Sequence, residues 1–480
     1  MNTHPNWFRI AGFFLAIAAA LSFSACSSTP KKKKRTILMT EYDDVRAGEQ
    51  GAASVAAQIG IMPDKALNDY VNKIGRRLLL GVPRRSFRYK FSVVDQTEPN
   101  AFALPGGHIF ISRGLLALAN NEDELACVIG HEITHANQRH SALQQGLAKR
   151  GLAIGYMQAS RMASYSREME RAADRGGQIL CAAAGYNPMG MSTFLRSLDQ
   201  NQRLELGYIR GPGFLDSHPG ASERAAANAA RVGEMRWKPD PRHGDTRASL
   251  LEQTAGLVVG HRPESGVFAG NLFLHPDMDF QLHFPTGWLT SNTTVAVGAI
   301  EPRQEAVVFL TADLPEGDPR VVAEDWFEDN REAQNMKIVK SEPVKIGHID
   351  GWRLRITAGG RGARTSAYVT FIPFHEATWS ISGVTSTFKE KTYLDRTLLV
   401  PRSFRPLGAE NRKSIRSTHL EVVTARPGES LVEISKRTGN AWNLPTTAVY
   451  NGVFVHHQFK GGEMVKIIKS RHYISPVPAS

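Results

Sequence analysis

One short stretch, GHEITHANQRH at 130–140, has the residue types and spacing for metal-dependent hydrolysis. His131 and His135 are four positions apart, which is just over one turn of a helix, so both imidazoles can bind one ion from the same face. Glu132 is rotated about 100° from His131 and can reach a water molecule on that ion. The pattern predicts a zinc site with Glu132 as general base, although an ordinary helix can carry the same residues by chance.

The sequence before this motif predicts the helix that would position these side chains. Asn121 can cap a helix that begins at Glu122, and Glu124 can complete a capping box three residues after the cap. The apolar pattern then continues at helical spacing through the motif. We therefore expect both histidines to lie on one helix.

A zinc site of this kind needs a third protein ligand and an open fourth position for water, whose pKa the metal lowers to about 7. The candidate lies downstream, where Ser166 can cap a helix that presents Glu170 and Asp174 one turn apart. Glu170 can bind the ion, and Asp174 can accept a hydrogen bond from a ligand histidine. A solvated acidic helix face is the alternative interpretation. We expect one Zn²⁺ per chain.

The N-terminus predicts export. The apolar stretch from Ile10 to Leu21 follows Arg9 and has the length of a signal peptide, which is too short to span a membrane. Residues 1–25 are therefore expected to be a signal peptide. Beyond it, we expect no transmembrane segment, because no later stretch is apolar for long enough.

The residues after the signal predict an anchor. Phe23 to Cys26 resembles a bacterial lipobox, in which Cys26 is lipidated, and Ser27 then favours the outer membrane. A secreted protein without a lipid is the alternative. The formal net charge is +12, but much of it comes from the KKKKR run within the predicted basic tether, residues 26–40. The rest of the chain is only mildly basic, so we expect no nucleic-acid partner.

Two cysteines remain if Cys26 carries lipid, namely Cys127 and Cys181. Export would place them in a compartment that permits disulfides. Both fall within helical patterns, and buried free cysteine is common, so we do not expect a disulfide framework. Whether these two are bonded to each other stays open.

The 480 residues are too many for one ordinary core and change character along the chain. Residues 41–260 predict a mainly α-helical domain with a small β-sheet, including strands near 89–94 and 107–112. Residues 266–407 alternate β-branched and aromatic runs with Gly/Pro turns and predict an α+β, mostly β domain. Residues 408–417 are polar and basic and predict a linker, followed by a small βααβ module at 418–470.

Five motifs, in order, resemble those of the HtpX/BepA-type zinc metallopeptidases, a family that includes CAAX prenyl and mitochondrial inner-membrane stress proteases. They are Asn100–Gly107 (NAFALPGG), Arg113–Leu116 (RGLL), Glu124–Ala126 (ELA), the His131 motif and Ser166–Asp174 (SREMERAAD). The resemblance covers roughly 41–232 and implies a zincin-type (gluzincin) peptidase domain.

This resemblance implies a role for each motif residue. His131, His135 and Glu170 would bind zinc. Glu132 would be the general base, and Asp174 would orient a ligand histidine. An edge strand would hold an extended substrate through its backbone; its residues are Asn100, Ala101, Phe102 and Ala103.

The resemblance also suggests a near-site element at His218, followed by Arg224. His218 would either stabilise the oxyanion or occupy the fourth position of the zinc and hold a resting enzyme shut, and a plain surface-loop histidine is the remaining interpretation. His140 is five residues after His135 and would point away from the metal face, so we expect it at the surface or in packing. The other histidines without a partner pattern are expected to be structural: His108, His261, His275 and His283.

Both C-terminal regions carry weaker resemblances. The FPTGW stretch at 284–288 is similar to the entry strand of the PsbP/Mog-one-like fold, where a scaffold or docking role is expected. Residues 418–470 look like a LysM-type module, which implies binding to N-acetylglucosamine-containing peptidoglycan. The loop at 453–459, which contains His456 and His457, departs from the usual LysM pattern.

Together these features predict a zinc-dependent endopeptidase that degrades misfolded or misassembled envelope proteins at the periplasmic face of the outer membrane of a Gram-negative bacterium. Expected partners are those substrates, peptidoglycan, and the membrane through the lipid anchor. The alternative is a periplasmic assembly factor or chaperone for outer-membrane proteins with a latched site. Cleavage requires the Glu132 carboxylate, whereas holding a client does not. A structural lipoprotein with an inactive peptidase domain is disfavoured because no motif position is missing.

Overall fold

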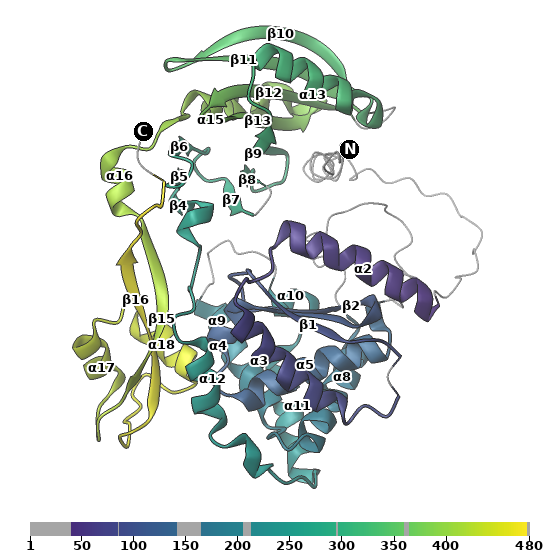
Figure 1. The fold of residues 1–480 in the computed structure, drawn as a ribbon, viewed down its shortest axis with the longest axis vertical. Coiled ribbons are helices and arrows are strands. Elements are labelled where there is room, and N and C mark those ends of the chain that lie inside the picture. Colours follow the sequence, from purple (N-terminus) through teal and green to yellow (C-terminus); the bar gives the residue numbers. More distant parts are fainter. Residues whose placement is uncertain are drawn as a thin grey trace. The chain divides into compact units, whose positions relative to one another are not determined.

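The computed structural model describes residues 40–84, 86–141, 165–204, 213–293, 296–359 and 364–477 (Figure 1). The predicted signal peptide, Cys26 and nearly all of the basic tether lie outside the described residues. The described chain forms two compact units, one from 262–416 with 472–477 and the other from 40–261 with 417–471. None of the described helices combines the length and the apolar character that crossing a membrane requires.

The unit that contains the HEITH motif surrounds a small sheet with helices. Its helices and strands up to residue 261 are α2 (Glu41–Gln58), α3 (Lys65–Leu79), β1 (Lys90–Val94), β2 (Ala101–Leu104), η2 (Pro105–Gly107), β3 (His108–Ser112), α4 (Arg113–Leu118), α5 (Glu122–Asn137), α8 (Arg167–Ala183), α9 (Gly190–Leu204), α10 (Phe214–Ser217), α11 (Ala221–Glu234), η3 (Pro241–His243) and α12 (Thr246–Thr254). The mainly helical region with a small sheet is therefore confirmed.

The small sheet has the strand order β1-β3-β2, with β1 parallel and β2 antiparallel to β3. The predicted edge strand is thus present as β2, which begins at Ala101 rather than Asn100. Gly106 and Gly107 turn the chain between β2 and β3 with φ values of 77° and 88°, a conformation that favours glycine. The edge strand packs against α5, so the sheet lies beside the motif helix.

Helix α5 lies in the core, with Leu125, Val128 and Ile129 fully buried. Its start confirms the predicted cap, since the Asn121 side chain accepts a hydrogen bond from the Glu124 backbone N–H at 2.9 Å. The Glu124 carboxylate accepts from the backbone N–H of Asn120 at 2.8 Å, one residue before the partner that a capping box would use. The predicted helix and its first residue are nevertheless correct.

The βααβ module belongs to the same compact unit as the motif helix. It consists of β15 (Arg416–Thr424), α17 (Leu431–Thr438), α18 (Leu444–Asn451) and β16 (Met464–His472), with β15 and β16 paired in a two-stranded sheet. The ammonium group of Lys466 is fully buried, and it donates hydrogen bonds to three carbonyl groups at the end of α4. The module is therefore packed onto the helical region rather than attached only by a flexible segment.

The other unit is mostly β, as predicted. A seven-stranded sheet has the order β10-β11-β12-β13-β9-β8-β7, and a four-stranded sheet has the order β14-β6-β5-β4. The elements are η4 (Pro263–Ser265), β4 (Val267–Ala269), β5 (Leu272–His275), β6 (Phe280–His283), β7 (Leu289–Asn292), β8 (Val297–Ile300), β9 (Ala306–Leu314), α13 (Pro319–Gln334), β10 (Lys337–Ile346), β11 (Ile349–Ala358), β12 (Thr365–Phe374), β13 (Ala377–Ser386), η5 (Thr387–Lys389), α14 (Glu390–Thr397), α15 (Leu399–Arg402), β14 (Arg405–Pro406) and α16 (Ala409–Ser414).

The segment predicted as a linker, 408–417, is different in the structure. Residues 409–414 form α16, whose Arg412 is paired with Asp279 and whose Asn411 donates to the Gln281 side chain at 2.8 Å. The polar composition of 408–417 is typical of a linker, but these two polar side chains form an ion pair and a hydrogen bond within the β unit.

Candidate metal centre

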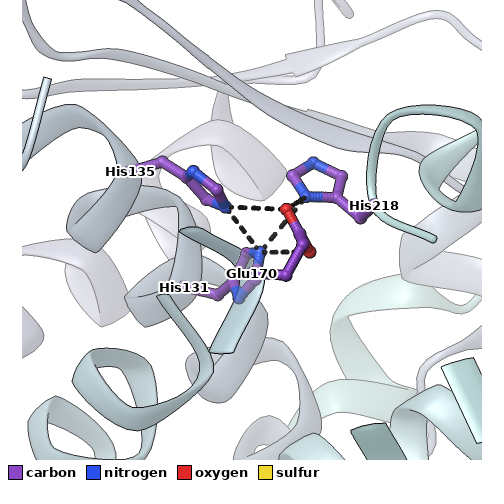
Figure 2. Close-up of side chains that lie close together, drawn as sticks. All are labelled: His131, His135, Glu170 and His218. Atoms are coloured by element: carbon purple, nitrogen blue, oxygen red, sulfur yellow. Dashed lines mark hydrogen bonds and ion pairs between the residues drawn. The ribbon is translucent and has the colours of Figure 1, made fainter. Parts of the chain in front are cut away.

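The two histidines of the motif converge with a carboxylate from the second helix (Figure 2). Both rings are fully buried, and the Nε2 atoms of His131 and His135 are 2.9 Å apart. Glu170, on α8, brings one carboxylate oxygen to 3.4 Å from His135 Nε2 and the other to 3.7 Å from His131 Nε2. The Ser166 side chain caps α8 as predicted, accepting from the Met169 N–H at 3.2 Å. Glu170 therefore faces the histidines and is not on a solvated helix face.

A third histidine joins this group from the end of α10. His218 is fully buried, and its Nδ1 lies 3.3 Å from His131 Nε2 and 2.9 Å from Glu170 Oε1. The Phe214 ring stacks on His218 with 4.2 Å between the ring centroids. A surface-loop position for His218 is therefore wrong. Each of the four residues offers one ligand atom, and these atoms lie within 4.8 Å of one another.

Glu132 lies beside this cluster and has no partner that would satisfy it. Both of its carboxylate oxygens are buried and lack a hydrogen bond among the residues that the structure describes. His218 lies close to this carboxylate, with its Nε2 3.6 Å from Oε1. Burial raises the pKa of Glu132 above its ordinary value, which suits a group that accepts a proton. A buried polar group without a partner is costly and is typical of a functional site.

Asp174 and Arg224 contact the ligand residues on the side away from the predicted metal position. Asp174 Oδ1 lies 3.0 Å from His131 Nδ1, the nitrogen that faces away from the other ligand atoms. Arg224 donates to both oxygens of Asp174, at 2.6 and 2.9 Å, and its Nη1 lies 2.6 Å from Glu170 Oε2. Burial alone would raise the pKa of Asp174, but the Arg224 and His131 contacts lower it well below its usual range. Arg224 thus fixes the carboxylates around the ligands.

His140 differs most from expectation, because it is packed against a ligand histidine instead of pointing away from the metal face. Its Nδ1 lies 2.9 Å from His135 Nδ1, the nitrogen that does not face the cluster. Helical spacing points His140 away from the metal face, but α5 ends at Asn137 and Arg139 has a left-handed φ of 56°, which turns the chain back. Burial lowers the pKa of His140 to about 4, so its neutral ring can accept a hydrogen bond from His135. Tyr165 stacks on His135 at a centroid distance of 4.0 Å.

The remaining histidines singled out in the sequence stay outside the cluster, which comprises only four of the described residues. They are His108, on β3, His261, His275, on β5, and His283, on β6. Asn100, Ala101, Phe102 and Ala103 are buried beside α5, and the Ser141 hydroxyl donates to the Ala103 carbonyl at 3.3 Å.

The donor set fits zinc, since imidazole nitrogens and a carboxylate oxygen are ligands that this ion prefers. Two histidines one turn apart, a glutamate from a second helix and an unpaired glutamate next to the first histidine define a zincin-type metallopeptidase site. Sequence comparison agrees, because residues 65–163 and 145–232 match Peptidase family M48. This region is an M48 family metallopeptidase domain, and M48 metallopeptidases use zinc.

Two curated relatives match part of the chain. The beta-barrel assembly-enhancing protease of Escherichia coli (strain K12) is 27% identical over 219 residues, which is 40% of this chain and 44% of the relative. The mitochondrial metalloendopeptidase OMA1 of Schizosaccharomyces pombe is 27% identical over 171 residues, which is 32% of this chain and 50% of the relative. The chain thus spans about half the length of these relatives.

A solved structure, that of cyanobacterial PsbP (CyanoP) from Synechocystis sp. PCC 6803, is similar over 31% of this chain and 98% of its own, with 12% identity and a TM-score of 0.26. This score is too low to establish a shared fold, so the PsbP/Mog-one-like assignment of residues 266–407 stays a prediction.

Proposed function

We propose that the protein is a zinc-dependent endopeptidase that cleaves misfolded or misassembled envelope proteins. The observation that carries this proposal is the convergence of His131, His135 and Glu170 on one point, with the unpaired Glu132 carboxylate beside it. The similarity to two proteases supports it.

Each residue has a task in this proposal. His131, His135 and Glu170 hold the ion, which when bound supplies a Lewis acid that polarises the scissile carbonyl. Glu132 takes a proton from the attacking water and passes it to the leaving amine. Asp174 Oδ1 lies 3.0 Å from His131 Nδ1, where it would accept the proton of that nitrogen and keep Nε2 free to bind. β2 lies at the edge of the small sheet, where an extended substrate could pair with its backbone.

The position of His218 favours a role as a fourth metal ligand that holds the resting enzyme shut over a role in stabilising the oxyanion. Its Nδ1 lies among the ligand atoms, where it would occupy the fourth position of a zinc ion. The enzyme would then rest in a closed state and need displacement of His218 before it cleaves. The same geometry favours the second candidate function, in which the protein holds clients as an assembly factor or chaperone with little proteolysis.

We also propose a location for the protein, which is based on its N-terminal sequence. The predicted signal peptide and Cys26 lipidation would anchor the protein at the periplasmic face of the outer membrane. One relative is named for enhancing β-barrel assembly, which supports envelope proteins as substrates. The paired β15 and β16 with two intervening helices have the order of a LysM-type module, which supports peptidoglycan as a partner.

The test is the rate of β-casein cleavage by zinc-loaded protein, compared with the Glu132→Gln variant. Glu168→Gln is the matched control, because Glu168 is exposed on the same helix as the ligand Glu170. We expect cleavage by the wild type and the control but none by Glu132→Gln, with zinc content equal in all three. If none of them cuts, His218→Ala decides: cleavage by this variant supports a latched peptidase, and its continued absence supports the holding function.

A further inference from the structure

Two cysteines face each other across the helices that carry the zinc ligands. Cys127 lies on α5, one turn before His131, and Cys181 lies on α8, in the same helix as Glu170 (Figure 1). Their sulfur atoms are 2.7 Å apart, and both residues are fully buried free thiols in the structure. Two sulfurs without a bond normally stay farther apart than this, so the side chains are already aligned toward each other.

The backbones of α5 and α8 approach closely beside this pair. A Cβ atom on Gly177 would come within 2.7 Å of the His131 backbone nitrogen, and one on Gly130 within 3.0 Å of the Gly177 carbonyl oxygen. Glycine at both positions therefore allows the contact between the helices. This contact fixes the separation of the two helices at the level of Cys127 and Cys181.

A metal-binding role for the two thiols is not supported. Among the described residues, the only group of three or more side chains that could hold a metal ion is the His131 cluster. The other polar atoms near the sulfurs are backbone carbonyls of Asn187, Pro188 and Asp123, at 3.7 to 3.9 Å. The thiols thus have each other as their main partner.

We propose that Cys127 and Cys181 form a disulfide bond that fastens the two ligand-bearing helices. One sulfur–sulfur bond forms and two S–H bonds break. The two electrons and two protons pass to a disulfide oxidant, which is reduced to two thiols through two exchange steps. In the cell this modification depends on the proposed export to an oxidising compartment.

The bond forms before the core closes. Both sulfurs are inaccessible in the folded protein, and burial, together with the Cys127 thiol, raises the pKa of Cys181 far above its ordinary value. Exchange requires a thiolate that an oxidant can reach, so it occurs while α5 and α8 are docking. Once formed, the bond is equally protected from added reductant.

The crosslink would constrain the metal site directly. Cys181 follows Glu170 by eleven residues, which is close to three full helical turns, so both side chains lie on the face of α8 that meets α5. The bond closes a long loop between the two helices, which restricts the unfolded chain and stabilises the folded unit.

The experiment uses the full chain with Cys26→Ser, so that two thiols remain, refolded in a buffer of reduced and oxidised glutathione. The protein is then denatured without reductant, alkylated with iodoacetamide and mapped by peptide mass spectrometry. We expect a linked peptide pair that contains Cys127 and Cys181, which separates only when reductant is added after denaturation. Alkylation of both cysteines in the refolded sample after denaturation without reductant would overturn the proposal.

A set of variants provides an independent readout. We expect Cys127→Ala, Cys181→Ala and the double variant to lose the same amount of thermal stability, about 10 °C, because each removes the same bond. The difference from the parent protein should shrink after reduction in denaturant and refolding under reducing conditions. Additive losses, or losses that reduction leaves unchanged, would contradict the bond. Neither readout uses proteolysis, so a linked pair in an inactive protein refutes only the proposed function.

Discussion

Replacing Arg224 tests whether the structure assigns it the right task, namely fixing ligand carboxylates. Arg224 is 5% exposed, and its guanidinium contacts both oxygens of Asp174, Oε2 of Glu170 and the His218 carbonyl. Arg224→Met keeps most of the side-chain volume but removes the charge and every one of these contacts. Two buried carboxylates would then lose their common partner.

The expected loss is large for one residue. Removing one partner of a buried ion pair typically costs about 3–5 kcal/mol, because the remaining charge stays desolvated. In zinc-free protein we therefore expect the free energy of unfolding to fall by about 4 kcal/mol. Zinc would return a positive charge to Glu170 but not to Asp174, so the loss should be smaller when zinc is bound.

The assay is urea unfolding followed by circular dichroism, with and without saturating zinc. Arg231→Met is the matched control, since Arg231 lies on the same helix and contacts the amide side chains of Gln178 and Asn228 instead of a ligand. We expect this control to lose about 1 kcal/mol, with no dependence on zinc. Equal losses in the two variants, or a loss in Arg224→Met that zinc does not reduce, would refute the assigned role.

Three further substitutions test other contacts. His140→Phe keeps a ring beside His135 but removes its hydrogen-bond partner, so zinc affinity in a chelator competition should fall about 10- to 100-fold; an unchanged affinity would contradict the contact. Lys466→Met leaves three carbonyls at the end of α4 unsatisfied and should cost about 3 kcal/mol in urea unfolding, whereas a neutral effect would show that the module is not held there. Burial lowers the pKa of His275 from 6.5 to about 4. Between these two pH values the unfolded chain binds a proton at His275 that the folded chain does not, so the free energy of unfolding falls as the pH drops from 6.5 to 4. His275→Gln should remove this loss, at most about 1.4 kcal/mol per pH unit, from urea midpoints between pH 6.5 and 4.

The parts of the site that depend on local periodicity could be predicted from the sequence. Asn121 and Ser166 cap α5 and α8 where expected, and the spacing of four residues places each pair of functional side chains on one face. Helix caps and helical spacing involve only a few neighbouring residues, so they can be predicted from the sequence without knowledge of the fold. The edge position of β2 came from the family resemblance, because strand order depends on distant pairing.

The contacts of His140 and Lys466 could not be predicted from the sequence, because they depend on a turn of the chain and on partners that are distant in the sequence. His140 returns to His135 only because α5 ends at Asn137 and the next turn is left-handed at Arg139. Lys466 follows a pattern typical of an exposed lysine on a strand, yet its partners lie almost 350 positions away in the chain at the end of α4. No local signal distinguishes such a lysine from a solvated one.

His218 connects the metal position and the base in a single side chain. Its Nδ1 lies with the ligand atoms, and its Nε2 lies 3.6 Å from Glu132 Oε1. Displacing this one ring would therefore open the fourth position of the ion and free the base together. The helices that carry the other ligands pack closely at Gly130 and Gly177, whereas α10 has four residues, Phe214–Ser217. The short α10 segment, rather than α5 or α8, is thus the part whose movement would convert a closed site into an open one.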